Sequence, residues 1–184
     1  MKTTTPNQHR KTDNFPKIDP TATVEADCLL CTDLVTGSGV RIKSGVQIGQ
    51  EVTIGNGSRI AKSAHISRAV TVGSGVRVGR DVVLDPECKI ADGARIKRGA
   101  RVAAVSTVGN YVRIGKATLI DKRVTIGAFC KIGDSACIRQ DATLGEDVQV
   151  AAGVAIGSDV VIEDHCRILV DVPAGSHVLA GQTF

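Results

Sequence analysis

Aliphatic residues recur at every sixth position along this chain. There are 26 such positions between residues 18 and 168, and 25 of them hold Ile, Val or Leu; Thr36, which has the shape of Val, is the exception. A smaller residue usually stands two positions earlier, and Gly often follows one or three positions later. Side chains alternate along a strand, so the small residue and the aliphatic residue face the same side. Because a period of six matches no helical face, the pattern predicts short strands joined by tight turns.

Three hexads close one triangular coil of 18 residues, and stacked coils would lie about 4.8 Å apart, as parallel strands do. The repeat therefore predicts an all-β protein, a parallel β-helix of about nine triangular coils without an extruded loop. We expect a polar N-terminal arm at residues 1–16, the repeat domain at residues 17–181 and a C-terminal tail at residues 182–184. The period breaks at residues 171–175, where Pro173 has no N–H to donate to a further ladder.

The repeat resembles the hexapeptide-repeat family over residues 18 to about 181. The segment 171–181, DVPAGSHVLAG, is similar to the last coil of acyltransferases in that family. The resemblance implies a left-handed coil and a homotrimer of parallel prisms. For an enzyme of the family it also implies a His that deprotonates the acceptor, and a thioester of acetyl-CoA, another acyl-CoA or acyl carrier protein. The chain departs from those enzymes in having no extruded loop, no His at the first turn position and the ending Gln182-Thr183-Phe184.

Composition narrows the class of protein further. Hydrophobic residues make up 42% of the chain but aromatic residues only 2%, so aliphatic residues and Cys must fill the core. No apolar run is long enough to span a membrane. Six Cys without an export signal predict reduced thiols and a cytoplasmic location. Cys28 and Cys31 have CxxC spacing, but no second pair or His partner completes a metal site, and we predict none.

Residues 18 apart stand above one another, so each outward position forms a column. One column is strongly cationic, and we call its charged members the basic ladder: Arg41, Arg59, Arg77, Arg95, Arg113, Lys131 and Arg167. The ladder is interpreted either as a solvated face or as a track for a polyanion or an acidic partner. Nucleic acid fits less well, because no aromatic side chains alternate with the cations to stack on bases.

A turn column changes character halfway along the chain. Four glycines give way to two aromatic residues, one Asp and one His, in the order Gly39, Gly57, Gly75, Gly93, Tyr111, Phe129, Asp147 and His165. One hypothesis makes His165 a catalytic general base that Asp147 orients, beside a pocket walled by the aromatic rings. The alternative is a corner whose side chains pack against a neighbouring subunit or cap.

Two functions follow from these features. The first, favoured by the absence of an extruded loop, is a non-catalytic scaffold or anion-binding trimer. The second is an O- or N-acyltransferase dependent on CoA or acyl carrier protein. In either case the least charged outward column predicts the subunit contact of the homotrimer, through Leu29, Val83, Leu119, Cys137 and Ala155.

Overall fold

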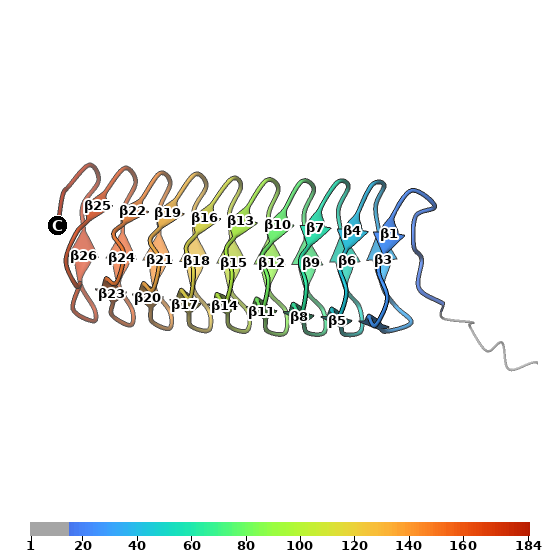
Figure 1. Ribbon diagram of the computed structural model, residues 1–184. Helices are drawn as coiled ribbons and strands as arrows, with labels where there is room; N and C mark the ends of the chain where they lie inside the picture. Colours follow the sequence, from blue (N-terminus) through green and yellow to red (C-terminus); the bar gives the residue numbers. More distant parts are fainter. Residues whose placement is uncertain (1–14) are drawn as a thin grey trace, which may run out of the picture.

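Each hexad forms one very short strand, and the strands wind into a straight three-sided prism (Figure 1). The computed structural model describes residues 15–184. Of the predicted N-terminal arm, residues 1–14 lie outside the described residues. From Thr23 to Arg167 a strand begins at every sixth residue, which confirms the predicted period and the absence of an extruded loop.

The strands form three parallel sheets, one on each side of the prism. The basic sheet carries the basic ladder and comprises β1 (Thr23–Val24), β4 (Arg41–Ile42), β7 (Arg59–Ile60), β10 (Arg77–Val78), β13 (Arg95–Ile96), β16 (Arg113–Ile114), β19 (Lys131–Ile132), β22 (Gln149–Val150) and β25 (Arg167–Ile168). The apolar sheet comprises β2 (Leu29–Leu30), β5 (Gln47–Ile48), β8 (His65–Ile66), β11 (Val83–Leu84), β14 (Arg101–Val102), β17 (Leu119–Ile120), β20 (Cys137–Ile138) and β23 (Ala155–Ile156). The threonine sheet comprises β3 (Val35–Thr36), β6 (Thr53–Ile54), β9 (Thr71–Val72), β12 (Lys89–Ile90), β15 (Thr107–Val108), β18 (Thr125–Ile126), β21 (Thr143–Leu144), β24 (Val161–Ile162) and β26 (His177–Val178).

Register between neighbouring strands is 18 residues along almost the whole prism. In the basic sheet, for example, Arg77 pairs with Arg95 and Val78 with Ile96. The first residue of each strand points outward and the second points into the prism, where it is buried from β3 onward. Every column inferred from the spacing is therefore a physical column of stacked side chains.

The core consists of aliphatic residues, with a few small polar side chains at the positions that precede each strand. Ser58, Ser106 and Thr118 are buried, and each hydroxyl donates to a backbone carbonyl, at 2.7, 2.8 and 2.8 Å respectively. Cys88, Cys130 and Cys166 fill equivalent small positions. Because these polar groups are satisfied, the narrow prism can bury them without the usual cost.

Two kinds of glycine shape the corners. Gly115, just after β16, is pressed against the next coil, since a Cβ there would lie 2.4 Å from the backbone carbonyl of Gly133. Gly57 instead has a φ of +66° and open space around its missing Cβ. The first glycine permits close stacking of coils, and the second supplies the left-handed turn that the sequence predicts.

The last coil is shorter than the others. His177 pairs with Val161, a separation of 16 residues rather than 18, and Val172 bridges to Ile156. The break in period at residues 171–175 is therefore confirmed. Residues 182–184, predicted as a tail, place Thr183 in a bridge with Arg167. The domain boundaries themselves stay a prediction. Within residues 15–184 no helix is long and apolar enough to cross a membrane.

Candidate functional site

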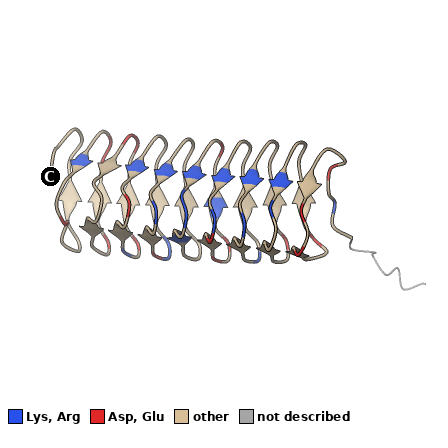
Figure 2. Ribbon diagram, viewed as in Figure 1, with Lys and Arg blue, Asp and Glu red and all other residues tan. Residues whose placement is uncertain are grey.

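The basic ladder forms a continuous charged stripe on one side of the prism, as the row of blue strands in Figure 2 shows. Six cations occupy successive coils from Arg41 to Lys131, each in register with the next. Gln149 then interrupts the stripe before Arg167. At the parallel-strand spacing the six span about 24 Å.

The ladder differs from the other charged columns in having no acidic partners. Elsewhere successive coils bring opposite charges together: Arg123 contacts Asp141 at 2.6 Å, and Arg101 contacts Asp85 at 2.8 Å. Across residues 15–184 the ion pairs include no ladder residue. Two unit charges about 5 Å apart repel by roughly 0.8 kcal/mol in water, so the stripe is tolerated only because it is solvated or neutralised by a ligand.

Further cations line the corner between the basic sheet and the apolar sheet. This corner carries Lys43, Lys62, Arg80, Lys97, Arg98 and Lys116. Its acids are partly engaged: Glu25 pairs with Lys43, and Asp134 lies 3.4 Å from the ammonium of Lys97. Hydrogen bonding from the backbone of Lys116 and from Lys97 keeps the pKa of Asp134 below its ordinary value. The positive surface thus extends beyond the ladder itself.

Shallow hollows lie between the stacked arginines. One of about 340 Å³ is bounded by Arg41, Arg59 and Arg77, with the apolar surface of Ile60 and Val78 beneath them. A second, of about 260 Å³, lies where Gln149 separates Lys131 from Arg167. An extended anion placed along the ladder would contact guanidinium groups at its edges and aliphatic surface below.

The turn column with the aromatic residues lies at the corner between the threonine sheet and the basic sheet, which we call the aromatic corner (residues 111, 129, 147 and 165). All four residues have a positive φ, like the glycines that precede them in the column. The rings of Tyr111 and Phe129 stack with centroids 5.6 Å apart and planes 9° apart. The sequence placed these residues correctly in one column.

His165 and Asp147 meet at this corner. Nδ1 of His165 lies 3.5 Å from a carboxylate oxygen of Asp147, and the two side chains are 70% and 47% exposed. With the carboxylate on the Nδ1 side, Nε2 faces away and can accept a proton from an acceptor hydroxyl or amine. The four hollows described in this section and below are lined by other residues. The catalytic role stays a prediction.

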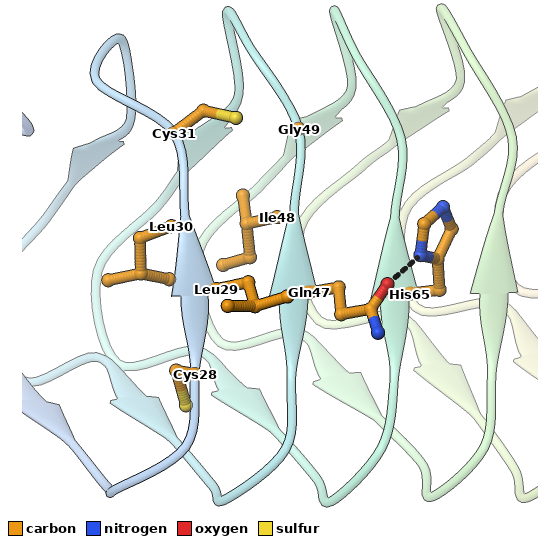
Figure 3. Close-up of a pocket in the computed structure, with 8 residues that line it drawn as sticks. All are labelled: Cys28, Leu29, Leu30, Cys31, Gln47, Ile48, Gly49 and His65. Atoms are coloured by element: carbon orange, nitrogen blue, oxygen red, sulfur yellow. Dashed lines mark hydrogen bonds between the residues drawn. The ribbon is translucent and has the colours of Figure 1, made fainter.

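The apolar sheet carries a hollow of about 440 Å³ at its N-terminal end (Figure 3). Leu29, 66% exposed, forms its rim, and a 3.2 Å hydrogen bond joins the side chains of Gln47 and His65. Figure 3 shows Cys28 and Cys31 pointing apart from opposite ends of one strand. Three residues of extended chain separate the two by roughly 10 Å, too far for a disulfide or a shared metal. The described part of the chain holds no group of three His, Cys, Asp or Glu that could bind a metal ion.

Two features of the surface escaped sequence reasoning. The first is the pair His177 and Glu163, 2.9 Å apart across the shortened last coil. The second is a hollow of about 410 Å³ beside Tyr111, which includes Asp92. Asp92 lies 18 residues after Ser74, so the column analysis contained the signal for the second feature. The 16-residue offset hid the first.

Comparison with solved structures identifies the class. The prism is similar to UDP-N-acetylglucosamine acyltransferase from Campylobacter jejuni, with a TM-score of 0.73 and 20% identity over 85% of this chain and 68% of that one. The enzymes from Moraxella catarrhalis (TM-score 0.70, 14% identity, 89% and 67% covered) and Francisella novicida (0.66, 17%, 86% and 62%) are also similar. The chain is thus a left-handed parallel β-helix of the hexapeptide-repeat class, as the sequence predicts, and it spans about two thirds of the length of these enzymes.

A sequence profile places the chain within that class. The profile described as the GMPPB C-terminal domain matches residues 60–154, just over half of the chain. The protein belongs to the GMPPB C-terminal domain family. A comparison with curated protein sequences finds no significant match.

Proposed function

We propose that the protein is an anion-binding β-helix whose basic ladder holds an extended polyanion or an acidic segment of a partner. The observation that carries this proposal is the absence of acidic partners along the ladder, while Arg68, Arg101, Arg123 and Arg139 on the rest of the surface each pair with a carboxylate. Repulsion along the stripe disappears when counter-charges bind, so part of the binding free energy comes from relief of that repulsion.

Retention on immobilised heparin, a flexible sulfated polymer, tests the proposal. The triple variant Arg59→Gln, Arg77→Gln, Arg95→Gln removes three adjacent ladder charges. Its matched control, Lys17→Gln, Lys89→Gln, Lys122→Gln, removes three exposed charges elsewhere. We expect the ladder variant to elute at much lower salt than the control. Equal elution of the two variants, or no retention of the wild-type protein at low salt, would rule out the ladder as the binding site.

A second candidate function is acyl transfer, favoured by the structural similarity to UDP-N-acetylglucosamine acyltransferases and by the His165–Asp147 pair. In this proposal Asp147 orients the imidazole and Nε2 of His165 takes the proton of the acceptor. CoA would supply the activated acyl group, and the unpaired cations of the basic sheet are the residues that would hold its phosphates.

Calorimetry with CoA separates the two functions. Absence of heat up to millimolar CoA would remove the acyltransferase proposal and leave the ladder untouched. If CoA binds, His165→Ala is expected to abolish turnover that depends on a thioester, while binding of CoA persists. Turnover retained by His165→Ala would exclude this residue as the base.

The oligomer proposed with either function is a homotrimer in a cytoplasmic setting, with the apolar sheet as the subunit contact. Support comes from the exposure of Leu29 and from the apolar character of Val83, Leu119 and Ala155 along the same outward column. Charged groups on this sheet are few, and Arg101 is already neutralised by Asp85. The mass of the particle in solution tests this arrangement.

A further inference from the structure

The stack of aromatic rings at the aromatic corner ends abruptly at Tyr111. Its ring lies over Gly93, where a Cβ would come within 2.4 Å of Cδ1 of Tyr111. Phe129 covers the ring from the following coil. On the preceding coils the column holds Gly75 and Gly57, and the space around a Cβ at either position is open. A further flat ring can therefore extend the stack above these glycines.

A hollow of about 410 Å³ occupies that place. Its walls are the ring of Tyr111 and the side chains of Arg77, Arg95, Asp92 and Ser74. The volume lies within the range of small-molecule sites. Tyr111 is 57% exposed, so the ring is accessible to a ligand.

The charges of the hollow are arranged for a ligand with an anionic end and a hydroxylated part. Arg77 and Arg95 are register partners on adjacent strands, and neither pairs with Asp92 or with any other acid in residues 15–184. Asp92 is fixed by the backbone N–H of Ser74, which donates to its carboxylate at 2.7 Å. Two guanidinium groups suit a phosphate, and a held carboxylate accepts hydrogen bonds from sugar hydroxyls.

We infer that this hollow binds a nucleotide, with the base stacked on Tyr111 and the phosphates on Arg77 and Arg95. A phosphorylated sugar attached to a flat aromatic ring is the chemical class that uses all three kinds of group at once. The inference rests in part on the proposed function, because Arg77 and Arg95 belong to the basic ladder. It adds a ring-binding site that the ladder alone does not have.

Calorimetric titration with ATP, with tripolyphosphate and with adenosine tests the inference on the full chain. We expect ATP to bind more tightly than either fragment. Tyr111→Ala is expected to weaken ATP binding roughly tenfold or more and to leave tripolyphosphate binding unchanged, because only the stacking contact is lost. Tyr111→Phe keeps the ring and should keep the affinity. Arg167→Ala, a ladder change on a distant coil, serves as the matched control and should bind ATP like the wild-type protein.

CoA provides a further arm of the same experiment, since it carries an adenine nucleotide. Tighter binding of CoA than of ATP would identify the ligand as a nucleotide-containing cofactor, and the reverse order as a free nucleotide; both orders require sensitivity to Tyr111→Ala. Equal affinities for ATP and tripolyphosphate, both insensitive to Tyr111→Ala, would overturn the inference. Heparin retention without ATP binding would overturn the inference alone, whereas ATP binding without heparin retention would remove only the polyanion track.

Discussion

Arg77 and Arg95 face each other across neighbouring parallel strands, two cations in register with no carboxylate between them. Arg123 and Asp141 also stand 18 residues apart, yet there the coils bring opposite charges to 2.6 Å. The same spacing thus produces an ion pair at one place and a repulsive contact at another. The stability of the protein must therefore depend on which ions surround the basic sheet.

Removal of one ladder charge is expected to stabilise the free protein at low salt. Arg77 has a cationic neighbour on either side, so Arg77→Gln relieves two repulsions that together amount to at most about 1.5 kcal/mol in water. Urea unfolding at 10 mM and at 500 mM salt would measure the effect. We expect a gain in the free energy of unfolding at low salt that vanishes at high salt through screening. A loss of stability at both salt concentrations would mean that Arg77 has a structural role.

The two kinds of corner glycine should respond differently to substitution. Gly115→Ala would place a methyl group against the backbone of Gly133, and we expect a loss of about 1–3 kcal/mol in the free energy of unfolding. Gly57→Asn, the matched control, introduces a residue that tolerates a positive φ into open space and should cost far less. Equal costs for the two variants would contradict the tight stacking of coils at residue 115.

Much of this architecture could be predicted from the sequence, because one period governs both the core and the surface. Once Ile42, Ile60 and Ile96 are known to point inward, the residues before them must point outward in columns. The unpaired state of the ladder could not be predicted, since it depends on where long side chains lie. The hollow beside Tyr111 depends on the tilt of one ring, and the 16-residue last coil follows a local break in the period. Whether His165 is catalytic lies beyond what a column position determines.

The buried thiols make stability depend on alkaline pH. Burial raises the pKa of Cys88 and of Cys130 to about 11, above the ordinary value of a thiol in the unfolded chain. Their contribution is complete below about pH 9 and is lost as the pH rises toward 11, because the unfolded state releases its thiol protons first. Each thiol accounts for about 2 kcal/mol over that interval.

Urea unfolding between pH 8 and pH 10.5 tests this dependence. The double variant Cys88→Ala, Cys130→Ala lacks both thiols and so isolates their share from that of Lys and Tyr. We expect the stability difference between the wild-type protein and the variant to shrink as the pH rises. A difference that stays constant over this range would show that the thiols ionise alike in both states.

Self-association through the apolar sheet predicts a particle of three chains in solution. Leu119→Glu would place a charge in the centre of that face and should dissociate the trimer to single chains of 19.2 kDa. Thr125→Glu, on the threonine sheet, is the control and should leave the mass unchanged. Light scattering coupled to size-exclusion chromatography measures both. A monomeric wild-type protein, or dissociation by the control alone, would contradict the choice of face.

The salt dependence of polyanion binding tests the basic ladder most directly. Gln149 is the one neutral position between Lys131 and Arg167, so Gln149→Arg completes the stripe. Titration of labelled heparin at several salt concentrations gives the slope of log K against log salt, which counts the cations that release counterions, at roughly 0.7–0.9 per contact. We predict a steep slope for the wild-type protein, steeper by about one contact and with higher affinity in Gln149→Arg. A slope near zero, or a Gln149→Arg variant indistinguishable from the wild-type protein, would contradict the account.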